Sequence, residues 1–207
     1  MWKALPALLI SAASVLSAQS QEQSVSHRFG LNLQVMLPTD TAGKLYKTGY
    51  SIGIPFYFHQ GEQVEGRLRV EIGHFEGKSR SVNSGFEKIS ADTRFIGYDW
   101  LVRLGPSREQ GDQGDQGGPG VDFLFGIGGA HWYQTLSYTS PAGTNMNYTD
   151  KGYGEKVAFV LSVGFIFHIS THVGIEAKQM LTSLPNSQRD FHDADLSHTS
   201  LGLAFRF

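Results

Sequence analysis

The C-terminal segment alternates strictly between apolar residues and small or polar ones, and this pattern leaves few options for its fold. One side of an extended strand would carry Thr199, Leu201, Leu203, Phe205 and Phe207, and the other Ser200, Gly202, Ala204 and Arg206. Most domains in water end in a frayed polar tail. A full-length strand with an aromatic last residue instead predicts the closing strand of a β-barrel in a membrane, facing lipid on one side and the lumen on the other.

Eight segments alternate in this way, and most approach the ~9–11 residues that a tilted membrane strand requires. They lie at about 27–37, 47–58, 65–75, 92–104, 121–133, 155–169 and 172–182 and at the C-terminus. The predicted fold is therefore all-β, an eight-stranded antiparallel transmembrane β-barrel. We expect no amphipathic helix.

The connections between these segments differ in length in a regular way. Four are long and polar, at 38–46, 76–91, 134–154 and 183–196, whereas 59–64 and 170–171 are short. Long extracellular loops and short periplasmic turns are typical of outer-membrane barrels. The exception is 105–120, a Gly/Gln/Asp-rich stretch where a periplasmic turn should stand; we interpret it as a flexible insertion, with a docking tether as the alternative.

The N-terminus predicts export. Lys3 precedes an apolar segment from Ala4 to Leu16, and small residues follow at 17, 18 and 20. This is the pattern of a secretory signal peptide, which we place at 1–20, with the barrel domain at 21–207. An uncleaved helical anchor is the alternative, but the apolar run is shorter than the ~20 residues that a spanning helix needs.

Composition narrows the function classes. The chain has no cysteine, which excludes disulfides, thiolate metal sites and cysteine nucleophiles. A formal net charge of -2 gives no indication of a nucleic-acid partner. No glycine-rich phosphate loop opens a helix, so the sequence predicts no nucleotide, and we expect no cofactor and no metal.

The second face of the predicted strands combines small residues with charges of both signs. The small residues include Gly97, Gly126, Gly128, Ala130, Gly174, Gly202 and Ala204, and they suit the crowded interior of a barrel of about eight strands. The proposed interior charge network consists of Arg69, Glu71, Asp99, Arg103, Glu176 and Lys178. Buried charges must be paired. The network would be either a plug that blocks or gates a pore or a purely structural core; in a soluble barrel the same charges would face water.

Aromatic residues should gather at the two lipid–water boundaries. On this basis Phe58 and Phe207 would mark the periplasmic rim, and Phe75 and Tyr133 the outer rim. Phe95 and Trp132 have the parity of the lumen face and do not fit either rim.

The C-terminal strand from Leu201 to Phe207 and the preceding hairpin from Val163 to Ala177 give the chain its family resemblance. Over 27–207 it resembles the small outer-membrane β-barrel superfamily of the OmpA/OmpX type. The resemblance implies location in the outer membrane of a Gram-negative-type bacterium, among outer-membrane lipid and lipopolysaccharide. It also implies that Leu203, Phe205 and Phe207 form a C-terminal signal read by the barrel assembly machinery.

We expect a structural or surface-interaction role with a largely closed interior. An extracellular ligand would meet the loops at residues such as Phe86, Lys88, Tyr138, Tyr148 and His192. A narrow passive pore, a lipid A-modifying enzyme and a soluble periplasmic ligand-binding barrel are the alternatives.

Two small motifs carry residue types that support chemistry. His168 and Ser170 resemble the His-x-Ser pair of lipid A deacylase barrels, in which a histidine activates a serine. His192, Asp193 and Asp195 with His198 have side chains that ligate metals, but polar loops produce such clusters by chance. We therefore expect no enzyme activity.

Overall fold

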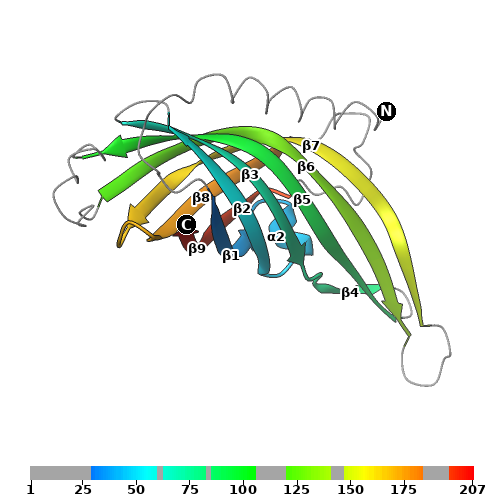
Figure 1. Cartoon of the computed structure of the whole chain (residues 1–207). Coiled ribbons are helices and arrows are strands. Elements are labelled where there is room, and N and C mark those ends of the chain that lie inside the picture. Colours follow the sequence, from blue (N-terminus) through cyan, green and yellow to red (C-terminus); the bar gives the residue numbers. More distant parts are fainter. Residues whose placement is uncertain (1–28, 60–62, 83–84, 106–119, 141–146, 184–195) are drawn as a thin grey trace.

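The strands form one antiparallel sheet that closes on itself (Figure 1). The computed structural model describes residues 29–59, 63–82, 85–105, 120–140, 147–183 and 196–207. The strands are β1 (Gly30–Pro38), β2 (Gly49–His59), β3 (Val64–Phe75), β4 (Ser79–Val82), β5 (Gly85–Leu104), β6 (Gly120–Thr139), β7 (Tyr148–His168), β8 (Val173–Ser183) and β9 (His198–Arg206).

Closure comes from two pairings between distant parts of the chain. The first strand pairs with the last, from Gly30↔Arg206 to Pro38↔His198, and β3 pairs with β5 from Val64↔Val102 to Phe75↔Ala91. The ring therefore contains eight strands, and β4 lies outside it as a short extension paired only with β5. This confirms the predicted eight-stranded antiparallel barrel.

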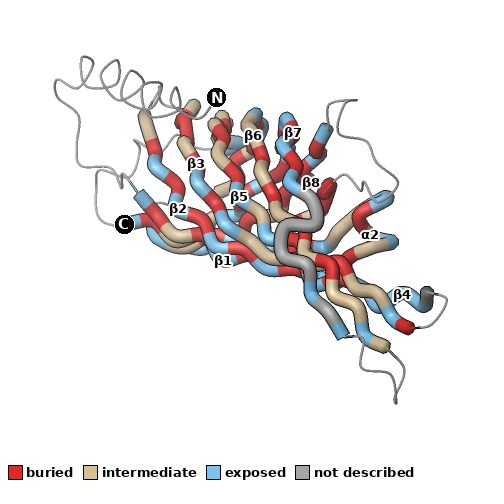
Figure 2. Tube along the Cα trace, turned by 90° about the vertical axis from the view of Figure 1, so that its right-hand side faces the viewer, coloured by how far each residue is buried: buried red, intermediate tan, exposed pale blue. Residues whose placement is uncertain are grey.

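Burial alternates along the strands in the predicted register (Figure 2). On β1, Leu33, Val35 and Leu37 are exposed, whereas Asn32, Gln34 and Met36 are buried. Apolar side chains predominate on the outside of the ring, and most of the polar and small ones face inward. The lumen is therefore a filled interior, and the outer surface is the apolar one.

The two ends of the barrel differ. At one end, the turn end, β1 begins, β9 finishes, and residues 169–172 join β7 to β8. At the other, the loop end, β5, β6 and β7 project beyond the rest (Figure 1). Residues 85–91, 134–139 and 148–154, which the sequence assigned to polar loops, are therefore largely strand. Backbone pairing continues there without a clear apolar face, so hydrophobic alternation could not reveal it.

The loop end of the lumen holds an apolar layer around a short helix, α2 (Ala42–Leu45), which the sequence did not predict. Tyr46, just after α2, has no exposed surface, and its hydroxyl accepts a hydrogen bond from Gln134 Nε2 at 2.8 Å. Two backbone hydrogen bonds join this segment to the residues that follow β3. Lys78 N–H donates to Leu45 O and Lys47 N–H donates to Glu76 O, both at 2.7 Å. Among the described residues, no helix has the length and apolarity to cross a membrane.

The prediction that Phe75 lies at the outer rim is wrong. The position of Phe75 on β3 has the parity of the inward residues Arg67, Arg69 and Glu71. Its ring is fully buried and packs against Tyr46 at 5.8 Å and His198 at 5.4 Å between ring centroids.

Candidate functional site: the charged interior

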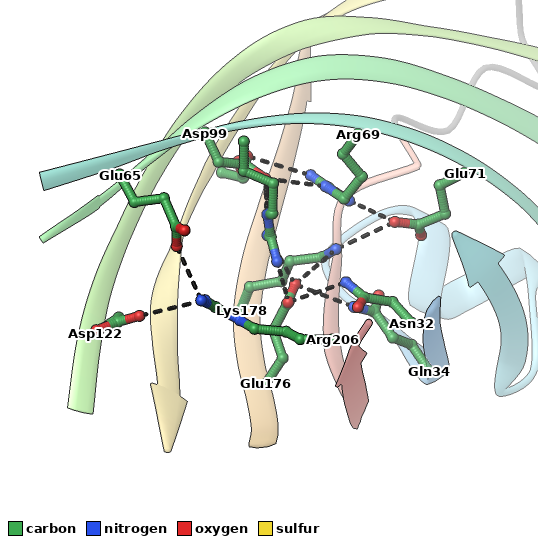
Figure 3. Close-up of polar contacts among 12 residues, drawn as sticks. Asn32, Gln34, Glu65, Arg69, Glu71, Asp99, Asp122, Glu176, Lys178 and Arg206 are labelled. Atoms are coloured by element: carbon green, nitrogen blue, oxygen red, sulfur yellow. Dashed lines mark hydrogen bonds and ion pairs between the residues drawn. The ribbon is translucent and has the colours of Figure 1, made fainter. Parts of the chain in front are cut away.

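A network of ion-paired side chains fills the middle of the lumen (Figure 3). We define the interior network as Arg67, Arg69, Glu71, Asp99, Glu176 and Lys178, each of which is less than 5% exposed. Three of these residues are cations and three are anions, so the network is formally neutral. Neutrality is needed because a buried charge without a partner is very costly.

Arg67 is the centre of the network. Its Nη2 lies 2.7 Å from Asp99 Oδ2 on β5, and its Nη1 donates to Glu176 Oε2 on β8 at 2.5 Å. Since β5 and β8 are separated around the ring by other strands on both sides, this side chain spans the lumen. The planar guanidinium suits this role because it presents several donors in a fixed geometry.

The other two cations complete the pairing. Arg69 Nε lies 3.1 Å from Asp99 Oδ2, and Arg69 also bonds Glu71. Lys178 Nζ lies 3.1 Å from both Glu71 Oε2 and Glu176 Oε1. Arg69 additionally stacks over the ring of Phe95, 4.2 Å from its centroid. Each carboxylate therefore meets at least two cations.

Neutral side chains from two further strands satisfy the remaining carboxylate oxygens. Asn32 Nδ2 and Gln34 Nε2 on β1 each donate to Glu176 at 3.1 Å, and Ser162 Oγ on β7 donates to Asp99 Oδ1 at 3.2 Å. These additional hydrogen bonds are what a buried ion pair needs in order to offset desolvation. The network thus ties together five strands of the ring.

A glycine makes room for Asp99. On β6, Gly126 lies directly opposite Asp99 in the register, and a Cβ built there would stand 2.0 Å from Asp99 Oδ1 and 2.5 Å from Ser162 Oγ. No side chain could occupy this position without displacing the carboxylate. Small residues on the inward face therefore do more than fit a narrow barrel: they create the space that the charges occupy.

A second ionic cluster lies at the turn end. Arg206 lies 3.0 Å from Glu65 Oε2 and 3.6 Å from Asp122 Oδ2, and its guanidinium stacks over Tyr57 at 4.2 Å from the ring centroid. Asp122 also accepts from Arg103 Nη1 at 3.3 Å and contacts His168 Nε2 at 2.7 Å.

The structure brings five of the six residues proposed for the network together and separates the sixth. Arg103 belongs to the turn-end cluster, because it lies nearer the turn end of β5 than Asp99 does, opposite Asp122. Arg67, the central residue, was not among the six predicted for the network, although it has the inward parity of Arg69 and Glu71 on β3. Asn32, Gln34 and Asp122 were missed, although their parity relative to Leu33 and Phe123 marks them as polar residues on an inward face.

The His168 and Ser170 pair does not assemble as a catalytic dyad. His168 turns toward Asp122 inside the barrel, whereas Ser170 Oγ accepts hydrogen bonds from the backbone N–H groups of His172 and Val173 in the turn. Of the metal-ligand candidates, His192, Asp193 and Asp195 lie outside the described residues, as do the 1–20 segment and most of 105–120. Within the described residues, no group of three or more His, Asp or Glu side chains could hold a metal.

The proposed assembly-signal residues occupy the outer face of the last strand. Leu203 and Phe207 are exposed, Phe205 is partly so, and Phe207 packs against Phe29 with ring centroids 5.8 Å apart. Their reading as a signal stays a prediction.

Comparison with solved structures identifies the architecture. The attachment invasion locus protein Ail of Yersinia pestis superimposes with a TM-score of 0.50 and 12% identity over 87% of this chain and 97% of that one. A major outer membrane protein from Thermus thermophilus gives a TM-score of 0.51 and 12% identity, covering 88% and 100% of the two chains. The chain has the fold of a small outer-membrane β-barrel. No protein-family model and no curated protein matches it.

Proposed function

We propose that this protein is a closed outer-membrane barrel that presents its loop end outside the cell as a surface for interaction. The interior network is the observation that supports a closed barrel. Arg67 bridges opposite walls, and its carboxylate partners have no exposed side-chain surface. A water-filled channel would leave such groups hydrated.

The outer surface supports placement in a membrane. Side chains such as Ile72, Phe159 and Leu201 are more than half exposed, and comparable residues surround the ring. Proteins in water rarely expose apolar patches larger than a few hundred Å². Lipid is the solvent that such a surface requires, and this argues against the soluble ligand-binding alternative.

The projecting strands support the interaction role. Phe86 is 55% exposed near the tip of β5, and Tyr138 lies near the tip of β6, paired with Glu87. Lys88, a second predicted loop contact, is held by Glu76 Oε1 at 2.6 Å. The side chain of Tyr148 and all of His192 lie outside the described residues. A rigid barrel that displays a short sheet and its loops is a common arrangement for binding.

Single-cysteine labelling tests the orientation cleanly, because the chain has no cysteine of its own. A membrane-impermeant maleimide should label Phe86→Cys in intact cells. It should label His172→Cys, at the turn end, only after the outer membrane is permeabilised. Equal labelling of both variants in intact cells, or recovery of the protein in the soluble fraction, would overturn the proposal.

A narrow pore is the second candidate, and one observation favours it. Asn32 Oδ1, Gln34 Oε1 and Ser200 Oγ are buried beside the network without a hydrogen-bond partner in the described residues, which is where ordered water would bind. Planar bilayers separate the two candidates: the closed barrel stays silent. Regular conductance steps that change in Glu176→Gln would instead establish a pore.

A further inference from the structure

The outer surface carries a group of polar side chains near the loop end, at positions that are apolar elsewhere on the barrel. In one row across the strands, Tyr50 on β2 pairs with His74 on β3, and His74 pairs with Asp92 on β5. In the next row toward the turn end, Ile72 pairs with Arg94. Arg94 thus stands between the polar row and the apolar row of Val70 and Ile96.

The carboxylates around Arg94 already have histidine partners. His74 Nδ1 lies 2.7 Å from Asp92 Oδ1, and His131 Nε2 lies 2.6 Å from Glu155 Oε1. The guanidinium of Arg94 lies 5.3 Å from the ring centroid of Tyr133. In the described part of the chain, no carboxylate forms an ion pair with Arg94. On a lipid-facing surface an arginine is costly in a depth-dependent way, so an anion at this level would stabilise it.

An apolar groove of about 840 Å³ runs from this cation across β3, β2, β1 and β9. Its lining is mainly aliphatic and includes Leu33, Val35, Ile52, Ile72, Leu201 and Leu203, while Arg94, Asp92 and His74 stand on its β3–β5 side. A phosphate-bearing lipid matches both features, because it presents a negative headgroup at the membrane boundary and a flexible apolar chain beside it.

We propose that this face holds one phosphorylated lipid of the outer leaflet, with its phosphate on Arg94 and an acyl chain in the groove. The proposal rests on the membrane placement proposed above. The guanidinium pairs with phosphate oxygens in the bidentate manner that arginine favours. Tyr50 and Tyr133 end the polar row next to Arg94, and amphipathic rings of this kind gather where a protein meets lipid headgroups.

Native mass spectrometry of the detergent-purified protein, titrated with lipid A, tests this site. We expect one tightly retained lipid A on the wild-type barrel and at least a fivefold loss of retention in Arg94→Gln. The matched control is Arg80→Gln, the same change on exposed β4 away from the groove, which should retain the lipid. Unchanged retention in Arg94→Gln would overturn the proposal.

A second pair of variants tests the groove while leaving Arg94 intact. Ile52→Trp fills the groove and should reduce retention, whereas Ile175→Trp, an apolar outward position on β8, should not. Equal effects of the two tryptophans would contradict a defined acyl site. Gel mobility without heating verifies that each variant is folded.

Two further probes separate the lipid from other sources of phosphate. Inorganic phosphate should not displace lipid A, and phosphatidylglycerol should be retained less well. Displacement by free phosphate, or equal retention of phosphatidylglycerol, would overturn an outer-leaflet lipid as the ligand. A soluble protein without heat-dependent mobility would instead defeat the membrane placement itself, so the two failures are distinguishable.

Discussion

The middle and the loop end of the lumen lie inside the same ring of strands, yet different interactions hold them together. The middle depends on ion pairs with specific partners, such as Arg67 with Glu176. The loop end depends on apolar packing around Tyr46, Phe75 and Trp132. Packing tolerates change of shape if volume is kept, whereas an ionic network loses several interactions when one member is removed.

The largest expected effect comes from removing the central cation. Arg67→Met leaves Asp99 and Glu176 short of a partner in a buried region, and we expect a loss of about 3–5 kcal/mol in the free energy of unfolding. Urea unfolding in lipid vesicles, followed by tryptophan fluorescence, measures it. The same substitution at exposed Arg80 is the control and should be close to neutral.

Tyr46→Ala probes the apolar layer and should cost about 3 kcal/mol. Tyr46→Phe keeps the ring but leaves Gln134 Nε2 without its acceptor, so about 1 kcal/mol is expected. Hydrogen exchange should quicken at the Lys47 and Lys78 amides in Tyr46→Ala, while the strands around the interior network stay protected. Equal losses for the two variants would mean that the hydroxyl, and not the packing, holds the α2 segment.

Gly126→Ala sharpens the comparison by adding a single methyl group to the ionic middle. The new Cβ would overlap Asp99 Oδ1, so the carboxylate must move, and we expect a loss of about 1–3 kcal/mol in the same urea assay. Gly129→Ala on the same strand is the control, since the nearest atom to its Cβ would be 3.9 Å away. A loss in Gly129→Ala as large as in Gly126→Ala would point to strand conformation and not to the network.

The smallest expected effect concerns the exposed ion pairs that Glu76 forms with Lys47 and Lys88. The hydrogen bond from Lys88 and the charge of Lys47 lower the pKa of Glu76 from its ordinary value. A carboxyl with a lowered pKa in the folded state stabilises above its unfolded pKa, and this contribution is lost as the pH falls through the folded pKa. Glu76→Gln should therefore remove a slight acid sensitivity of amide exchange at Lys47. Because solvent screens these ion pairs, they contribute little to stability. A loss of stability in Glu76→Gln as large as that in Gly126→Ala would contradict this prediction.

Much of the barrel could be predicted from the sequence because lipid-facing strands have a period of two. Alternating apolar residues such as Leu33, Ile54 and Phe165 indicate where the strands lie. The glycines and charges between such residues must then face inward. The projecting part of β5 to β7 could not be predicted, because Gly85 to Ala91 carry no apolar alternation. The α2 segment was also missed, since four residues leave no periodic pattern.

Sequence by itself determined which side chains face inward, because parity on a strand is a local property of the backbone. Tertiary structure alone decided which of them meet. Register and closure place Arg67 of β3 opposite Glu176 of β8, and they give Asp99 and Arg103 of β5 different partners. The physical reason is that pairing across the lumen depends on the stagger of all eight strands, which no single segment encodes.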